Sequence, residues 1–430
     1  DAWNSDAVLS GNRTRRFRGK HLFLFVIRLW CHSGHMLILN LDNLRNDTKY
    51  ITAWSNAGFT NQFVSHINLL YMASLADRVP IIPPFYPDHH ISHDQAVLPF
   101  GAVFDLDALR RHMRMPILEW RDIKPINAAD FPTDSEQDLP VESIGCWSTR
   151  PHNAPDPIQA HVLMHHLRLE ASYTRVPQWT HRVPSDESDM HTVVWPLVQL
   201  IWHGRGPSKD GEREHVWWGA YSGAHIPPDP HVACFDFLYN VAAGTHDFEW
   251  NYAYSPAWRF VAQHLPFSQL SKDRARRYAR KAFRLEPGAP LPPYIAVHIR
   301  RGDFGRSCEE QGLDSAAVCF APLSMYERQV QEVRQELLER HGLDVELVIL
   351  SSDEEDPTFW DEVKALGWSF IDHEAEQTRG KYGEWWSIAI DVAIQANADG
   401  FVGTDQSTVS LVSARRVAQW NRGATRMVKW

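Results

Sequence analysis

The stretch YIAVHIRRGDF, residues 294–304, joins an apolar strand directly to a group of charged residues. Its first six residues have the composition of a buried strand. Alternation along a strand turns His298 and Arg300 to one side and Ile299 and Arg301 to the other. The stretch therefore predicts a buried strand whose C-terminal end presents charged side chains.

Strands and helices alternate after this stretch. The pattern predicts strands over 345–350, 368–371 and 400–403, and helices over 324–340, 357–367, 385–397 and 407–419. Such alternation is typical of α/β proteins in which helices cover both faces of a parallel sheet and ligands bind at the carboxyl ends of its strands. Three strand ends are therefore expected to meet in one crevice: HIRRGD (298–303), SSDEED (351–356) and GTDQST (403–408).

The chain before residue 294 has a clear pattern only near its start. A strand at 50–54, a polar turn at 55–62, a helix at 63–78 and a strand at 79–85 predict a βαβ unit. Residues 86–230 show poor periodicity, so we expect insertions or binding loops there. LEPGAPLPP, 285–293, follows a basic helix predicted at 271–284 and is expected to link two domains, 50–285 and 286–430.

The first 49 residues are expected to form a separate N-terminal segment. Its apolar run at 22–31 follows the basic sequence RTRRFRGK, which is typical of a signal or anchor segment. Two interpretations stay open, a buried first strand or the remnant of a membrane anchor whose beginning is missing before Asp1. Acceptor sequons at Asn12 and Asn46 favour the lumen of the endoplasmic reticulum or Golgi.

Composition and charge narrow the classes of ligand. The 430 residues carry a net charge of −10, which argues against a nucleic-acid binder and requires a local basic cluster for any anionic ligand. Among five cysteines there is no CxxC pair, and Cys308 and Cys319 bracket a short segment that either closes a disulfide loop or holds two free thiols.

The crevice has the residue types that bind a diphosphate. A guanidinium binds phosphate oxygens in bidentate fashion and stays charged, while Ser407 and Thr408 stand where the last helix opens and add hydroxyl and backbone donors. Two structural alternatives stay open: Arg301 pairs with Asp303 or with a helix and only braces the loop, and the two hydroxyls are an ordinary helix cap.

Other motifs point less clearly to a site. HVLMH (161–165) lacks the glutamate of a metalloprotease helix, DHHISH (88–93) is expected to be a polar loop, and the acids of FDLDALRRHM (104–113) are expected to begin a helix. No GxxxxGK[ST], GxSxG or GxGxxG motif is present, which argues against nucleotide hydrolysis, esterase and dinucleotide functions.

Taken in order, these motifs resemble those of the GDP-fucose-dependent fucosyltransferases, closest to the protein O-fucosyltransferases. AGFTNQ (57–62) is similar to the family's Gly-x-Phe-Gly-Asn-Gln loop, HIRRGD to its His-Leu-Arg strand end, VILSSDEED to its Ser-Asp strand end, and IDVAIQANADGFVGTDQSTVS (390–410) to its donor segment. The resemblance implies a GT-B-like architecture, in which two Rossmann-like domains face each other across a cleft. Thr60 stands where the family has glycine, and Val409 where an aromatic residue is frequent.

The resemblance also implies roles for individual residues. Arg300 would contact the β-phosphate and the leaving oxygen, His298 the ribose or guanine, and Asp391 the guanine edge. The remaining donor residues would be Asp353, Ser407, Thr408 and Val409, and Gly58, Phe59 and Asn61 would face the sugar and orient the acceptor hydroxyl.

These roles imply an inverting transfer of fucose from GDP-fucose to a hydroxyl of a protein or glycan, with no metal and no other cofactor. A fixed arginine can neutralise the leaving diphosphate, and no second carboxylate is evident to form a covalent intermediate. Two alternatives stay open: a core-type α-1,6-fucosyltransferase acting on N-glycans, which the double arginine favours, and an inactive relative that only binds the GDP-sugar.

Overall fold

The computed structural model describes residues 41–430 except 89, 125–141, 155, 203–215, 218–222, 224–225, 245, 306–319 and 430. The described residues belong to one compact unit, Leu39–Trp430. Cys31, Cys308, Cys319, Asn12 and the apolar run at 22–31 lie outside the described residues, so the predictions made for them stay predictions. None of the described helices has the length and hydrophobicity that a membrane span requires.

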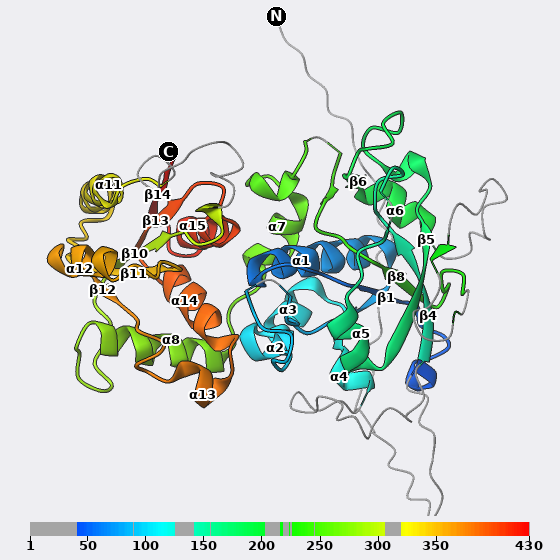
Figure 1. The fold of residues 1–430 in the computed structure, drawn as a ribbon, viewed down its shortest axis with the longest axis horizontal. Helices are drawn as coiled ribbons and strands as arrows, with labels where there is room; N and C mark the ends of the chain where they lie inside the picture. The colour runs from blue at the N-terminus through cyan, green and yellow to red at the C-terminus, as the bar shows by residue number, and fades with distance from the viewer. Residues whose placement is uncertain are drawn as a thin grey trace, which may run out of the picture. The chain divides into compact units, whose positions relative to one another are not determined.

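The second half of the chain folds around an all-parallel sheet (Figure 1). Its five described strands follow the order β12-β11-β10-β13-β14, which is a Rossmann-like order with β10 at the centre. They are β10 (Tyr294–Ile299), β11 (Leu347–Ser352), β12 (Ser369–Phe370), β13 (Gly400–Thr404) and β14 (Ala424–Val428). All were predicted except β14, which follows the last predicted helix.

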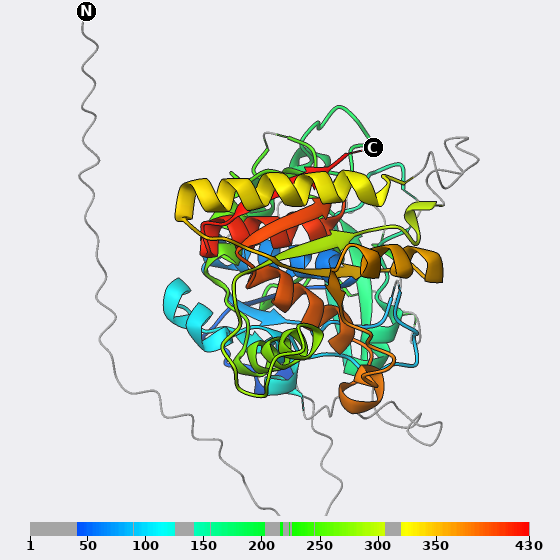
Figure 2. The ribbon, with the colours of Figure 1, turned by 90° about the vertical axis from the view of Figure 1, so that its left-hand side faces the viewer.

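Helices cover both faces of this sheet because the side chains of β10 alternate. Ile295, Val297 and Ile299 are buried in the same core as residues of α11 (Leu323–His341), the yellow helix of Figure 2, and of α12 (Pro357–Ala365). Tyr294 and Ala296 are buried with residues of α8 (Gln269–Ala282), α14 (Trp386–Ala396) and α15 (Thr408–Trp420). Both layers place the carboxyl end of β10 at the edge of the sheet where α15 begins.

The first half is built around a larger mixed sheet. Its described strands follow the order β3-β2-β1-β8-β4-β5-β7, and only β7 is antiparallel to its neighbour. They are β1 (Tyr50–Ala53), β2 (Val79–Ile82), β3 (Leu118–Glu119), β4 (Glu142–Ser148), β5 (Leu169–Arg175), β7 (Val216–Trp217) and β8 (Val232–Phe235). A separate pair joins β6 (Thr192–Val193) to β9 (Val241–Ala242).

Helices complete the first half, and the longest of those described is α1 (Phe59–Ala76). The shorter ones include α2 (Phe100–Val103), α3 (Leu106–Met113), α4 (Trp120–Ile123), α5 (His161–Leu167), α6 (Val194–Leu200) and α7 (Pro256–Phe260), and α13 (Thr378–Tyr382) belongs to the second half. Asp105 caps α3 by accepting from the Ala108 amide at 2.9 Å, so FDLDALRRHM begins a helix as predicted. The domain boundary predicted at 285/286 stays a prediction.

Two expectations for the first half are wrong. Residues 86–230 are not only insertions and loops, because they contain β4 and β5. In β5, polar Glu170, Ser172 and Thr174 are buried and hide the apolar pattern of a strand. The turn predicted at 55–62 ends earlier, because α1 already begins at Phe59 with Gly58 as its extended N-cap.

A disulfide in the first half was not predicted. Cys146 in β4 and Cys234 in β8 are both buried and bonded to each other. The two strands are parallel neighbours, and Trp147 and Phe235, which follow the cysteines, are partners in the register. The bond therefore crosslinks two strands at the middle of the sheet, between residues 88 apart in the sequence.

Candidate active site

Arg300 follows β10, and its position is fixed by several contacts. Its backbone amide donates to Thr404 Oγ1 at 2.9 Å. Its Nη1 lies 2.5 Å from Asp353 Oδ2, and its Nη2 lies 2.5 Å from Asp303 Oδ1 and 3.1 Å from His90 Nε2. The side chain is 19% exposed. Carboxylates and an imidazole thus hold the guanidinium at the carboxyl edge of the sheet while part of it remains accessible.

Arg301 is directed elsewhere, as strand alternation predicts. Its Nη1 lies 3.0 Å from Glu354 Oε2, and its guanidinium packs 4.6 Å above the ring of Phe359 at the start of α12. The alternative in which Arg301 pairs with Asp303 is wrong, because Asp303 binds Arg300 instead. Arg301 therefore braces the loop through Glu354.

The loop after β10 makes a close approach that requires glycine. Gly302 has a φ of +22°, and a Cβ at this position would lie 2.3 Å from Asp353 Oδ2. The same carboxylate accepts from the Arg301 amide at 2.7 Å. Asp353 thus organises the HIRRGD loop and orients Arg300.

His298 is buried at the end of β10, beside the start of α15. Burial, and then the charge of Arg300, lower the pKa of His298 to about 3. Its Nδ1 lies 2.7 Å from Ser410 Oγ, which also accepts from the Thr404 amide at 3.0 Å. The imidazole is therefore neutral at ordinary pH, and its hydrogen bond ties β10 to the first turn of α15.

The N-terminus of α15 lies next to this histidine. Ser407 is the N-cap residue and accepts from the Ser410 amide at 3.4 Å. Val409 is half-buried and packs against the apolar core. The first amides of a helix have no acceptor within the helix and carry a partial positive charge, so this end of α15 can bind an anion.

A second helix N-terminus meets the first. Thr408 Oγ1 of α15 donates to Asn61 Oδ1 of α1 at 2.9 Å. Gly58 precedes α1, and the His90 ring lies beside it, at an ordinary contact distance of 3.5 Å from where a Cβ would stand. The ring of Phe59 is buried against Phe85, with ring centroids 4.5 Å apart, so Phe59 contributes packing and its backbone. Two helix N-termini and Arg300 therefore lie around one site.

Gln62 holds the loop before α1 in place. Its Nε2 donates to the carbonyls of Ala57 and Tyr86, both at 2.8 Å, and its Oε1 accepts from the Tyr86 amide at 3.1 Å. The side chain is fully buried. Gln62 is therefore a scaffold residue that positions Gly58 and Asn61.

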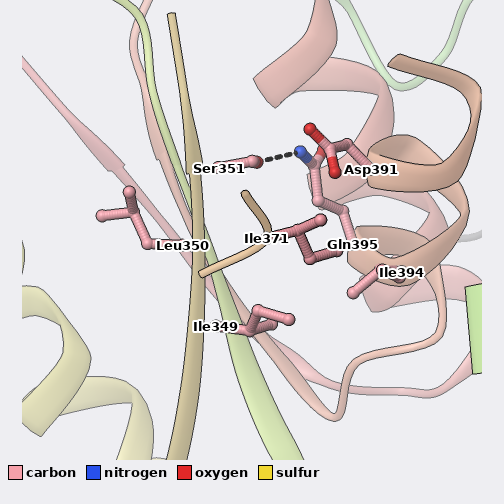
Figure 3. A pocket seen from close by; sticks show the side chains of 7 residues that line it. All are labelled: Ile349, Leu350, Ser351, Ile371, Asp391, Ile394 and Gln395. Atoms are coloured by element: carbon pink, nitrogen blue, oxygen red, sulfur yellow. Dashed lines mark hydrogen bonds between the residues drawn. The ribbon is translucent and has the colours of Figure 1, made fainter. Parts of the chain in front are cut away.

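Asp391 lines a small pocket between β11 and α14 (Figure 3). Its apolar part is formed by Ile349, Leu350, Ile371 and Ile394. The Gln395 amide donates to Ser351 Oγ at 2.7 Å. Asp391 Oδ1 lies 2.9 Å from His373 Nε2. The pocket encloses about 10 Å³, which is room for roughly one water molecule, so it does not itself enclose a nucleotide base.

Five polar residues near the site were not singled out from the sequence: Gln62, His90, His373, Thr404 and Ser410. Ser410 follows Ser407 by three residues within the first turn of a helix, a spacing from which its proximity could have been expected. His90 and His373 lie in loops, where neither strand nor helix period gives a signal. Among the described residues, no group of three His, Cys, Asp or Glu side chains is arranged to hold a metal ion.

Comparisons with known proteins agree with the predicted family. The model of the family described as GDP-fucose protein O-fucosyltransferase matches residues 50–418, a range that includes every predicted site residue. No curated protein sequence matches the chain.

Solved structures show the fold. A structure of POFUT1 in complex with GDP superposes with a TM-score of 0.54 at 15% identity and covers 90% of this chain and 100% of its own. POFUT1 in complex with GDP-fucose gives 0.53 at 16% identity, covering 89% and 98%. The fucosyltransferase NodZ from Bradyrhizobium gives 0.40 at 13% identity, covering 86% and 93%. The GT-B-like α/β fold predicted from the sequence is confirmed.

Proposed function

The chain belongs to the GDP-fucose protein O-fucosyltransferase family, and on this premise we propose that Arg300 and the N-termini of α1 and α15 bind the diphosphate of GDP-fucose. As a member of the family, the protein is a GDP-fucose fucosyltransferase. One observation carries the proposal: the 2.9 Å hydrogen bond between Thr408 and Asn61 brings two helix N-termini together close to a fixed guanidinium. This arrangement concentrates positive charge where a leaving diphosphate develops negative charge.

In this proposal each predicted residue has a role that its contacts support. Arg300 binds the β-phosphate and the leaving oxygen, and Asp353 orients it. Ser407 offers its hydroxyl to the phosphates, and Thr408 and Val409 offer their backbone amides, because the Thr408 hydroxyl already donates to Asn61. His298, neutral at ordinary pH, offers the ribose one hydrogen bond, and Asp391 accepts from the guanine edge. Gly58, Phe59 and Asn61 contribute the start of α1, which faces the sugar.

The transfer proceeds as a single displacement. The bond between C1 of fucose and the β-phosphate oxygen breaks, and its electron pair leaves on the diphosphate. The acceptor oxygen bonds to C1 from the opposite face, so the configuration at C1 inverts. The proton of the acceptor hydroxyl passes to water. Asp303 and Asp353 are both held by Arg300, so neither is available as a nucleophile for a covalent intermediate.

Arg300 and the helix N-termini supply the positive charge in this mechanism, so we expect fucose transfer to continue in EDTA. The acceptor is a hydroxyl of a protein or glycan in the secretory pathway. Two observations support the lumen of the endoplasmic reticulum or Golgi: the Cys146–Cys234 disulfide and the exposed Asn46 of an acceptor sequon.

The test compares the two adjacent arginines. We expect Arg300→Ala to lower the rate of GDP release from GDP-fucose at least about 100-fold, as loss of a preorganised charge donor does. Arg301→Ala is the matched control, and we expect it to retain GDP release within about threefold, since Arg301 acts only on the loop. Calorimetry with GDP and circular dichroism check binding and folding. Absence of GDP binding by the wild-type protein, or an unchanged rate in Arg300→Ala, would overturn the proposal.

The acceptor needs a separate assay. Fucose transfer to folded small protein domains is compared with transfer to free N-glycans. We expect transfer to the folded domains. Transfer to the free glycans alone would replace protein O-fucosylation by the α-1,6 alternative, and GDP binding without any GDP release would support the inactive relative.

A further inference from the structure

Asp391 is the end of a hydrogen-bonded chain that reaches back into the core. His373 Nε2 lies 2.9 Å from Asp391 Oδ1, and His373 Nδ1 lies 3.0 Å from Thr378 Oγ1. Thr378 Oγ1 in turn lies 2.8 Å from the Tyr278 hydroxyl of α8. Thr378 and Tyr278 are both buried. Three separate parts of the fold therefore fix the plane of the His373 imidazole.

The direction of the last hydrogen bond follows from chemistry. A carboxylate only accepts hydrogen bonds, so His373 Nε2 carries the hydrogen that is shared with Asp391. Burial lowers the pKa of His373, but the charge and hydrogen bond of Asp391, with the charges of Asp372 and Glu376, outweigh burial and raise it. The donor at Nε2 is present in the protonated ring and in the neutral tautomer that accepts from Thr378.

The carboxylate held in this way faces the pocket of Figure 3. Among the described residues, His373 is the hydrogen-bond partner of Oδ1 and no residue bonds Oδ2. Guanine offers two neighbouring donors on one edge, N1–H and N2–H₂, whereas hypoxanthine lacks the second. Recognition of both donors requires a carboxylate whose plane is fixed, because each hydrogen bond depends on direction.

We propose that His373 is a positioning residue that fixes the plane of the Asp391 carboxylate and so gives the donor site its preference for guanine over other purines. The inference rests on the proposed function, in which Asp391 contacts the base. His373 itself does not touch the nucleotide. Its effect is therefore expected on nucleotide selectivity and on KM for GDP-fucose, and not on kcat.

The experiment measures the affinities of GDP and inosine diphosphate by calorimetry. The wild-type protein is expected to prefer GDP by about tenfold or more. His373→Ala is expected to reduce this ratio about tenfold, because the plane of the Asp391 carboxylate is then no longer fixed toward both guanine donors. His373→Gln places an amide donor near the position of Nε2 and is expected to restore most of the preference. Glu374→Ala, an exposed neighbour in the same loop, is the control and keeps the wild-type ratio.

The outcomes separate the two proposals. If Asp391→Asn keeps the wild-type ratio, Asp391 does not contact the base and that part of the proposed function is wrong. If Asp391→Asn lowers the ratio but His373→Ala does not, only the positioning role is wrong. Should His373→Ala fail to fold, Thr378→Val takes its place, since it removes the bond to Nδ1 and leaves Asp391 intact, and an unchanged ratio in that variant overturns the role of His373.

Discussion

The two sheets of the protein are stabilised in different ways. In the second half, β10 is buried along its whole length, and His298, one residue before its end, is its only ionisable side chain near neutral pH. In the first half, polar groups lie inside the sheet and are joined to one another. Ser143 Oγ of β4 donates to Glu170 Oε1 of β5 at 2.7 Å, and Thr52 Oγ1 of β1 donates to the Ile81 carbonyl of β2 at 2.8 Å. The Cys146–Cys234 disulfide crosslinks two strands of the same sheet.

The two halves therefore derive their stability from different interactions. An apolar sheet is stabilised by burial over many residues, so no single contact dominates. A sheet with buried polar groups depends on specific bonds, because each unpaired group costs about 1–3 kcal/mol. We therefore expect single substitutions to lower the stability of the first half more than that of the second. We expect the functional side chains to lie at the carboxyl edge of the second sheet.

Removal of the disulfide is expected to have the largest effect. Cys146→Ala/Cys234→Ala removes a crosslink between residues 88 apart in the sequence, which typically lowers the free energy of unfolding by about 2–5 kcal/mol. Urea unfolding measures the loss, and calorimetry with GDP provides the control, because none of the proposed donor-site residues lies on β4 or β8 and the affinity should be kept. An unchanged unfolding midpoint would show that the first half does not depend on its crosslink.

The same contrast explains what the sequence could predict about the fold. In the second half, short apolar runs followed by polar residues identified β10, β11 and β13 and the helices between them. In the first half, buried Glu170 and Ser172 concealed β5, because their hydrogen bonds to Ser143 and to the Ile226 amide exist only after folding. The start of α1 was placed four residues late because Gly58 and Asn61 are typical turn residues.

The candidate site was predictable where it lies on regular elements. Arg300, Asp353 and Ser407 follow strands whose ends must meet in a parallel sheet, and the structure brings them to one edge. His90 and His373 come from irregular segments, whose places are set by contacts distant in the sequence. The pairing of Asp303 with Arg300, in place of Arg301, depends on loop geometry that sequence spacing does not encode.

Two buried histidines allow a direct comparison of the halves under acid. Burial lowers the pKa of His66 to about 3, and burial with Arg300 does the same for His298. Both pKa values lie below the unfolded value of about 6.5, so the unfolded chain binds more protons at acidic pH. Their contribution to stability is complete above pH 6.5 and is lost as pH falls toward 3. At pH 5 we expect each histidine to lower the free energy of unfolding by about 2 kcal/mol relative to neutral pH.

Substitution by leucine separates the two sites. Within the described residues neither ring nitrogen of His66 has a hydrogen-bond partner, whereas His298 bonds Ser410. We expect His66→Leu to keep its stability at pH 7.5 within about 1 kcal/mol and to unfold less readily than wild type at pH 5. His298→Leu should gain similarly at pH 5 but lose about 1 kcal/mol at pH 7.5. If the free energies of unfolding of wild type and His66→Leu changed in parallel with pH, buried His66 would not be a source of the loss of stability in acid.

The smallest effect concerns one of the contacts between the two halves, the hydrogen bond between Thr408 and Asn61. Thr408→Val removes the hydrogen bond from Oγ1 to Asn61 Oδ1 while keeping the shape of the side chain. A double-mutant cycle with Asn61→Ala isolates the contact, and we expect a coupling of about 0.5–1 kcal/mol in the free energy of unfolding without donor, because the bond is only partly buried. Thr425→Val in β14 is the control and should show no coupling with Asn61. Additive effects of Thr408→Val and Asn61→Ala would mean that the hydrogen bond between the two helix N-termini does not contribute to stability.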